Sequence, residues 1–259
     1  MDRIDPRKKS GRDVQRMFDA IAPRYDLLNR VLSAGFDRRW RREAVQLALV
    51  DRTDAEVLDL CCGTGDLALA FAGDRRVRSV LGLDFSQPML RNARRKADRP
   101  TARRSAVRFA GADAAALPVV SRRFDVASIA FGLRNLVDPV AGLRELVRVL
   151  KPGGSLVVLE FFAATGGLAA ASFRWYFRHV LPRLGRLATS GAGVDAYRYL
   201  PESVAAFEPA SSVVEWLRSA GCDRVERRPF LFGAVELICG GVSTAVTERC
   251  GDARVECFA

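Results

Sequence analysis

The chain has 259 residues and 49% of them are hydrophobic, so it can form one large α/β domain with a full core, or at most two small domains. The formal net charge is +11 and comes almost entirely from arginine; a GC-rich genome explains most of this bias, although the surplus also suits nucleic acid, a phospholipid surface or a phosphate-bearing cofactor. We expect a cytoplasmic protein with reduced thiols and no metal site, because the sequence lacks a transmembrane run, a secretory signal and cysteines at zinc-ligand spacing.

Residues 12–49 have apolar positions at helical spacing, interrupted by a polar stop at Asp37, so we expect residues 1–50 to form a helical cap. From residue 56 the pattern changes to short apolar runs typical of strands buried on both faces: EVLDLC, SVLGLD, VRFAGA, FDVASIAF and SLVVLEF. Helix-like stretches separate these runs. The alternation predicts βαβ units and a Rossmann-like α/β domain with a mainly parallel sheet over residues 51–240.

The carboxyl-terminal third is less regular. KPGG at residues 151–154 predicts a helix stop followed by a turn into the next strand. An insertion of about residues 163–200 follows, and RVERRPF and GAVELIC then predict an antiparallel hairpin that completes seven strands. Residues 241–259 have no clear periodicity, so we expect a poorly ordered extension there.

Ligands of such sheets bind beyond the carboxyl ends of the strands, so the residues that follow each strand are the most informative. After the first strand comes CCGTGDLA, in which Gly63 and Gly65 allow a tight turn and a close approach of the backbone to a ligand. These letters also nearly match the dinucleotide fingerprint. A nicotinamide or flavin enzyme is therefore an alternative at this point.

Acidic residues at the strand ends narrow the choice of cofactor. Asp84, after the second strand, can accept hydrogen bonds from both hydroxyls of a ribose, although it could instead cap the following helix. After the third strand, Asp113 can receive an adenine amine while Ala114 offers its backbone amide. Asp59, inside the first strand, suits a positively charged sulfur better than a pyrophosphate. The set favours S-adenosylmethionine as the cofactor.

Longer motifs carry a resemblance to a known family. LDLCCGTGDLAL, GLDFSQPML, FDVASIAFGLRNLVDP, LRELVRVLKPGGSLVVLEF and YRYLPES closely resemble the quinone-biosynthesis C-methyltransferases, which act on demethylmenaquinone and on the equivalent ubiquinone precursor. The likeness runs from about Met17 to Gly240. It implies a class I S-adenosylmethionine-dependent methyltransferase whose substrate is a prenylated quinol.

The resemblance also implies roles for single residues. Arg134 corresponds to an arginine linked to activating water, and it could also stabilise a developing phenolate; Asn135 would orient the substrate. The alternative is structural, with Arg134 paired to Asp138. The remaining expected cofactor contacts are Thr64, Ala130 and Phe131, although Ala130 replaces a serine that relatives often have. Tyr25 is expected to close over the cofactor, and Ile238 stands where many relatives have a histidine.

The stretch at 172–190, SFRWYFRHVLPRLGRLATS, mixes aromatic residues with arginines. It suits a lid on an aromatic head group, with Tyr176 and His179 as candidate substrate or lid residues, or a helix at an anionic membrane interface. An ordinary amphipathic helix is the alternative.

We expect no nucleic-acid partner, because the sequence has no base-clamping signature, and a homodimer is compatible with the sequence. Methylation of another small aromatic metabolite and a non-catalytic scaffold are the competing functions.

Overall fold

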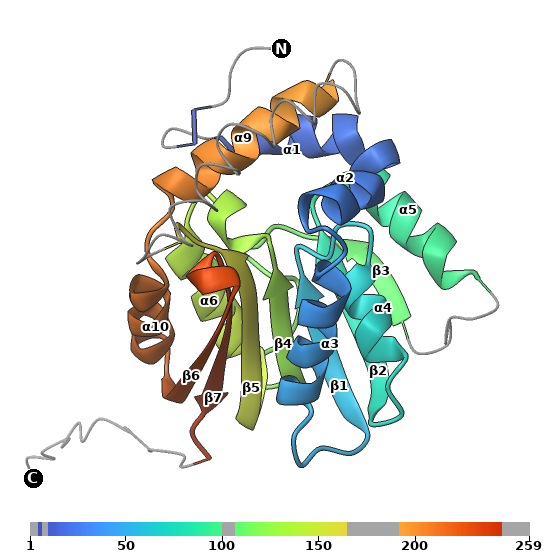
Figure 1. The fold of residues 1–259 in the computed structure, drawn as a ribbon. Coiled ribbons are helices and arrows are strands. Elements are labelled where there is room, and N and C mark those ends of the chain that lie inside the picture. Colours follow the sequence, from blue (N-terminus) through green and yellow to red (C-terminus); the bar gives the residue numbers. More distant parts are fainter. Residues whose placement is uncertain (1–4, 7–9, 100–106, 165–191, 245–259) are drawn as a thin grey trace, which may run out of the picture.

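The computed structural model describes residues 5–6, 10–99, 107–164 and 192–244. They form a seven-stranded sheet in the order β3-β2-β1-β4-β5-β7-β6 (Figure 1). The strands are β1 (Ala55–Leu60), β2 (Val77–Asp84), β3 (Val107–Gly111), β4 (Phe124–Ala130), β5 (Leu150–Phe161), β6 (Cys222–Phe230) and β7 (Val235–Val242). β1 to β5 are parallel, whereas β7 pairs antiparallel with both β5 and β6. The prediction of a mainly parallel sheet with a final antiparallel hairpin is confirmed.

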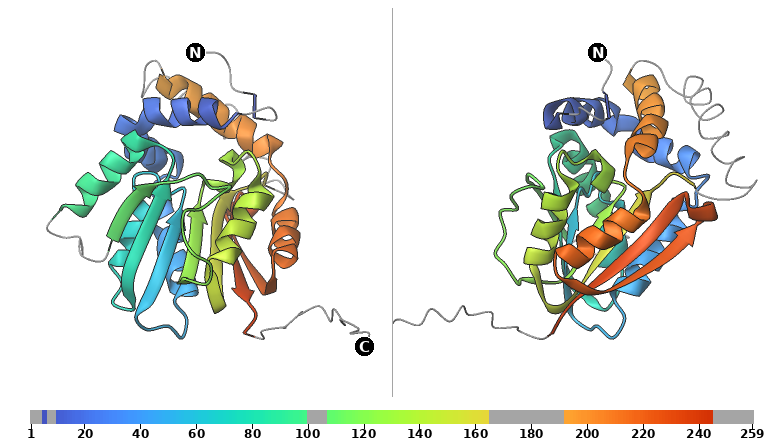
Figure 2. Two further views of the ribbon diagram at one scale, coloured as in Figure 1. Left: turned by 180° about the vertical axis from the view of Figure 1, so that it is seen from behind. Right: turned by 90° about the vertical axis from the view of Figure 1, so that its left-hand side faces the viewer.

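Helices cover both faces and one edge of this sheet. The α-helices are α1 (Gly11–Ile21), α2 (Tyr25–Leu32), α3 (Asp37–Ala48), α4 (Asp66–Ala72), α5 (Gln87–Ala97), α6 (Pro139–Arg148), α9 (Ala192–Ala206) and α10 (Ala210–Ser219), and the short 3₁₀ turns are η1 (Ala22–Arg24), η3 (Leu133–Asn135) and η5 (Leu231–Gly233). α3 and α4 pack on one face, and α6 and α10 on the other. α1 and α9 lie side by side above the carboxyl ends of the parallel strands (Figures 1 and 2).

The two large buried clusters of the core are separated by the sheet. Along β1, Val57 joins the cluster under α3 and α4, whereas Leu58 and Leu60 join the cluster under α6 and α10. Successive strand residues point to opposite faces, so a strand covered on both sides must be apolar at nearly every position. Each fully buried leucine or phenylalanine stabilises the fold by about 1.5–3 kcal/mol.

Side-chain caps define where three helices begin. Ser10, Ser86 and Asp138 each accept a hydrogen bond from the backbone N–H three residues later, at α1, α5 and α6 respectively. Because Ser86 caps α5, Asp84 is not needed as its cap. Asp138 caps α6, and the carboxylate that pairs with Arg134 is that of Glu160, 2.6 Å from Nη1. The predicted structural pairing of Arg134 with Asp138 is therefore wrong.

The amino-terminal helices lie in two places relative to the sheet. α1 and α2 lie above the sheet edge, whereas α3 packs on the sheet face. Asp37 begins α3 instead of ending a helix, and its carboxylate forms a short ion pair with Arg41 one turn later. At the other end, β7 continues to Val242, beyond the expected boundary at residue 240.

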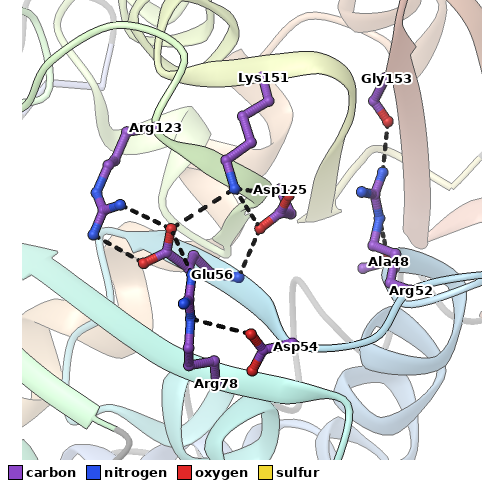
Figure 3. Close-up of polar contacts among 9 residues, drawn as sticks. All are labelled: Ala48, Arg52, Asp54, Glu56, Arg78, Arg123, Asp125, Lys151 and Gly153. Atoms are coloured by element: carbon purple, nitrogen blue, oxygen red, sulfur yellow. Dashed lines mark hydrogen bonds and ion pairs between the residues drawn. The ribbon is translucent and has the colours of Figure 1, made fainter.

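The amino-terminal edge of the sheet is held by a network of charges (Figure 3). Glu56, in β1, is 5% exposed and accepts from Arg123 Nη2 at 2.8 Å and from Arg78 Nη2 at 3.3 Å. Lys151 Nζ lies 2.9 Å from Asp125 Oδ2 and 3.7 Å from Glu56 Oε2. The network therefore links the amino-terminal ends of β1, β2, β4 and β5, on the side of the sheet opposite α1 and α9.

Cys61, Cys62, Cys222 and Cys239, in the part of the chain that the structure describes, are free thiols. Burial raises the pKa of Cys222 to about 12 and that of Cys239 to about 11. Thiols that stay protonated are poor nucleophiles, so these residues act as small core side chains.

Candidate active site

The loop between β1 and α4 turns at two glycines with left-handed backbone, with φ of +55° at Gly63 and +81° at Gly65. A Cβ on Gly65 would lie 2.8 Å from Phe109 Cζ, so the packing beneath the loop leaves no room for a side chain. The Asp84 carboxylate accepts hydrogen bonds from the backbone N–H groups of Gly63 and Ser86, each at 2.8 Å. The end of β2 therefore fixes the shape of the glycine loop.

A cavity of about 670 Å³, here called the large cavity, lies at the carboxyl ends of β1 to β4. The predicted cofactor residues that line it are Gly63, Asp84, Asp113, Ala114, Ala130 and Phe131. α1 contributes Val14, Gln15 and Phe18 to the opposite wall. The volume lies in the range typical of cofactor sites. Two carboxylates at the ends of β2 and β3, together with a loop that turns at two glycines, fit the ribose, adenine and amino-acid parts of S-adenosylmethionine.

Asp59 does not line the large cavity. It is 1% exposed, and Ser128 Oγ in the neighbouring strand β4 donates to its Oδ1 at 2.8 Å. Burial raises the pKa of Asp59 to about 7, against the opposing effects of the Ser128 hydrogen bond and the Arg41 charge. Asp59 thus lies in the sheet interior, where it joins β1 to β4.

Thr64 also lies outside the wall of the large cavity. Its hydroxyl donates to Asp26 Oδ1 at 2.6 Å and accepts from Lys96 Nζ at 2.9 Å. Lys96 additionally contacts Asp66 Oδ1 at 2.5 Å. Thr64 and its neighbours therefore tie the glycine loop to α2 and α5.

A narrower cavity, here called the small cavity, adjoins the large one beneath α1 and α2. Six aromatic side chains line it: Phe18, Tyr25, Trp40, Phe131, Phe161 and Tyr199. The ring centroids of Phe131 and Phe161 are 4.7 Å apart, and Trp40 lies 6.3 Å from each. Phe18, Tyr25 and Phe131 line both cavities. An aromatic wall of this kind suits a planar ring as ligand.

Arg134 lines the small cavity and is held there by a buried ion pair. Its Nη1 donates to Glu160 Oε1 at 2.6 Å and to the Phe131 carbonyl at 2.7 Å, and Nε donates to Ser203 Oγ at 3.4 Å. Glu160 is fully buried and also accepts from the backbone N–H groups of Arg134 and Phe161. These contacts hold the guanidinium in one position against an apolar wall, where a cation interacts strongly with any anion that forms.

Asn135, the next residue, lines the large cavity instead. Its Nδ2 donates to the Phe131 carbonyl, and its Oδ1 accepts from the Tyr199 hydroxyl, both at 3.2 Å. The turn η3 begins just after Phe131, whose φ of +56° is unusual for a residue with a side chain. This bend lets two neighbouring residues project into two neighbouring cavities.

Sequence reasoning missed Glu160, Trp40 and Tyr199. Glu160 comes near the end of SLVVLEF, where the rule that strand-end residues face the site could have identified it. Tyr199 and Ser203 both belong to YRYLPES, a motif noted only for its resemblance. No local signal marked Trp40, which is apolar and sits in a regular helix.

Four further positions considered in the sequence have different outcomes. Tyr25 lines both cavities, and burial raises the pKa of its hydroxyl, so the group stays neutral. Tyr176 and His179 lie outside the described residues. Ile238, where the resemblance implies a histidine, is fully buried in the cluster under α6 and α10 and lines neither cavity.

Comparisons with known proteins show which family the chain is similar to. A model of the ubiE/COQ5 methyltransferase family matches residues 6–241. The demethylmenaquinone methyltransferase of Thermus thermophilus is 50% identical over 224 residues, which cover 86% of this chain and 99% of that protein. The enzyme of the same name from Deinococcus radiodurans is 46% identical over 230 residues, which cover 89% and 92%. The ubiquinone/menaquinone biosynthesis C-methyltransferase UbiE of Syntrophotalea carbinolica is 44% identical over 233 residues, which cover 90% and 95%.

Solved structures with low sequence identity share the fold. A SAM dependent methyltransferase from Aquifex aeolicus has a TM-score of 0.58 at 16% identity and covers 84% of this chain and 97% of its own. The [4+2]-cyclase SpnF has a TM-score of 0.59 at 20% identity and covers 94% and 97%. Since a cyclase is among these neighbours, the fold does not define the reaction, and the site residues must carry that argument.

Proposed function

The chain belongs to the ubiE/COQ5 methyltransferase family and is an S-adenosylmethionine-dependent methyltransferase, and from this premise we propose that it methylates a ring carbon of a prenylated quinol, converting demethylmenaquinol to menaquinol. The resemblance noted from the sequence motifs is confirmed. The specific substrate comes from the names of the relatives, and the arrangement of the two cavities supports it.

One observation carries the proposal: an aromatic cavity with a fixed arginine adjoins the cofactor cavity. Phe131 belongs to both walls, and Arg134 and Asn135 follow it at the same turn. The small cavity measures about 60 Å³, so a quinol ring can stack among its aromatic side chains only after they move apart. Gly63, Asp84 and Asp113 hold the cofactor in the large cavity. When bound, S-adenosylmethionine supplies an electrophilic methyl group.

Arg134 provides the electrostatic part of the mechanism. A quinol carbon becomes a good nucleophile when the adjacent hydroxyl loses its proton, and we assign that proton to water because the arginine stays charged. The guanidinium, held by Glu160 and the Phe131 carbonyl, stabilises the phenolate oxygen. Methylation then replaces one ring hydrogen, which leaves as a proton. Asn135 and Tyr199 hold the turn and the ring in position.

A prenylated substrate resides in a membrane, so we propose that the protein, as a monomer or a homodimer, works at an anionic membrane surface. The net charge of +11 favours such contact. None of the helices in the described part of the chain combines the length and apolar character that a bilayer crossing requires.

The proposal is tested by following methyl transfer with mass spectrometry, using labelled S-adenosylmethionine and demethylmenaquinol in vesicles of anionic or neutral lipid. One labelled methyl on the reduced substrate is expected, with none on the oxidised quinone and a faster initial rate in anionic vesicles. Clear cofactor binding without product would overturn the substrate assignment. Equal rates in both kinds of vesicle would overturn the membrane contact.

Substitution of Arg134 tests the mechanism. Arg134→Ala should lower kcat by roughly 10²–10³-fold, the range for loss of one oxyanion donor, while the shift in Tm caused by S-adenosylhomocysteine is retained. Arg227→Ala is a matched control, because it removes another Arg–Glu pair, with Glu236 at 2.7 Å, away from both cavities.

Arg134→Ala also leaves Glu160 buried without that partner, which can unfold the protein. The double variant Arg134→Met/Glu160→Gln removes both charges and avoids this problem. Near-normal turnover in the folded double variant would exclude an electrostatic role for Arg134.

A further inference from the structure

The small cavity contains a second polar region, which the proposed mechanism does not use. Tyr25, Asn29, Ser33 and Asp37 all line this cavity and are spaced four residues apart, from α2 into the start of α3. Tyr25 and Asn29 lie one turn apart on α2, whereas Ser33 lies in the turn that follows and Asp37 begins α3. Together they form part of the cavity roof. Arg134 comes from the sheet edge below.

Most of these four residues have partners within the protein. Ser33 Oγ donates to Asp37 Oδ1 at 2.8 Å, and Asp37 also pairs with Arg41. Asn29 differs. Its amide lies beside the Tyr25 hydroxyl, whose pKa it lowers against the larger effect of burial, but Nδ2 is buried and forms no hydrogen bond of normal geometry with any residue in the described ranges.

An unpaired amide at this position needs an explanation. Buried polar groups are nearly always hydrogen-bonded, since an unmade bond carries the full cost of desolvation. Asn29 lies on the wall of a cavity that is otherwise mainly aromatic. A ligand that occupies this cavity can therefore supply the missing partner.

We infer that Asn29 binds the second oxygen of the substrate ring, the hydroxyl para to the one that Arg134 stabilises. This inference rests on the proposed function and deepens it. A quinol carries its two oxygens at opposite ends of a flat ring, and the cavity offers Arg134 at the sheet edge and Asn29 in the helical roof. The amide can donate to a hydroxyl oxygen and accept from a hydroxyl proton, so it suits this group in either orientation.

The inference makes Asn29 a specificity residue for the second hydroxyl of the proposed substrate, whose ring carries two hydroxyls para to each other. The second hydroxyl does not activate the carbon that is methylated, so it contributes through binding and positioning. A site built to bind a hydroxyl discriminates strongly against an analogue that lacks it, because the partner on the protein is then left unpaired.

The test compares two substrates with three forms of the protein. The substrates are short-chain demethylmenaquinol and the matched prenyl naphthol that keeps the activating hydroxyl but lacks the one para to it. The proteins are the wild type, Asn29→Leu, which is nearly isosteric, and Asn92→Ala. Asn92 is a matched control because its Nδ2 donates to the Ala22 carbonyl and it lines neither cavity.

We expect wild type and Asn92→Ala to favour the diol over the naphthol by about 10-fold or more in kcat/KM. Asn29→Leu should lose roughly that factor on the diol and keep the wild-type value on the naphthol. Its Tm should equal or exceed that of wild type, because an unpaired buried group has been removed. The Tm shift caused by S-adenosylhomocysteine should remain.

The experiment distinguishes a failure of the Asn29 inference from a failure of the proposed function. Equal losses on both substrates, or an unchanged preference for the diol, would overturn the role of Asn29 while leaving the proposed function intact. A wild-type protein that binds S-adenosylhomocysteine but methylates neither substrate would overturn the proposed function and this inference with it.

Discussion

Asp59 shows how a single buried residue couples the fold to pH. The residue occupies the middle of a parallel sheet, and burial raises its pKa to about 7. In an unfolded chain an aspartate has a pKa of about 4. As the pH rises, the unfolded state therefore loses this proton first, so the stability that this group contributes falls between pH ~4 and ~7.

The first prediction at the residue scale concerns Asp59→Asn. The wild type should lose about 2–3 kcal/mol of unfolding free energy between pH 5 and pH 8 relative to this variant, because the variant does not ionise. Urea denaturation at both pH values measures the difference. Asp74→Asn is the control: Arg76 lowers the pKa of Asp74, so its contribution changes only below about pH 4. An identical pH dependence in wild type and Asp59→Asn would contradict the raised pKa.

At the scale of elements, the turn from β4 into η3 determines the geometry of both cavities. Gly132 lies in this turn, and a Cβ there would be 2.5 Å from Cys61 Cβ. A side chain at residue 132 would therefore push β4 and the glycine loop apart. The position of Phe131, Arg134 and Asn135 thus depends on one glycine that packs against a neighbouring loop.

We therefore predict that Gly132→Ala lowers stability by about 1–3 kcal/mol, the usual cost of overpacking, and weakens S-adenosylhomocysteine binding and turnover together. Calorimetric titration and the methyl-transfer assay measure these effects. Gly73→Ala serves as the comparison, because its Cβ would lie 3.5 Å from the nearest atoms, an ordinary contact. Loss of turnover with unchanged cofactor affinity would show that the turn affects only the small cavity.

The elements were easier to predict from the sequence than the contacts between them. The strands and the glycine loop followed from apolar runs and from the residues that end them. By contrast, the pair between Arg134 and Glu160 joins residues 26 positions apart, and the contact with Ser203 spans 69 positions. Periodicity reports which face of an element is buried but not which distant side chain meets it. This is why Asp138 was the wrong partner, and why the unpaired amide of Asn29 became visible only in the fold.

At the scale of the whole molecule, the carboxyl and amino ends of the strands differ in function. The carboxyl edge carries both cavities, whereas the amino edge carries the charge network around Glu56 (Figure 3). The side chain of Glu56 is 7% exposed, but those of Arg123 and Arg78 are 53% and 54% exposed, so solvent screens part of their attraction.

Glu56→Gln should therefore lower the unfolding free energy by roughly 1–3 kcal/mol, because several cations lose a shared partner. The kcat and KM of methyl transfer should stay unchanged well below Tm. Glu43→Gln provides the surface comparison, since its pair with Arg39 is more exposed and should contribute less than about 1 kcal/mol. A change in KM in Glu56→Gln would show that the amino edge influences the site.

The wall that the two cavities share has a consequence for how the ligands bind. Phe18, Tyr25 and Phe131 face both cavities, so any shift of these side chains when one cavity fills also reshapes the other. Thermodynamic linkage makes this effect reciprocal: the factor by which methyl donor changes the affinity for acceptor equals the factor by which acceptor changes the affinity for donor. The half-saturation concentration for each ligand then depends on the concentration of the other. The rate of methyl transfer therefore responds to the concentrations of donor and acceptor together.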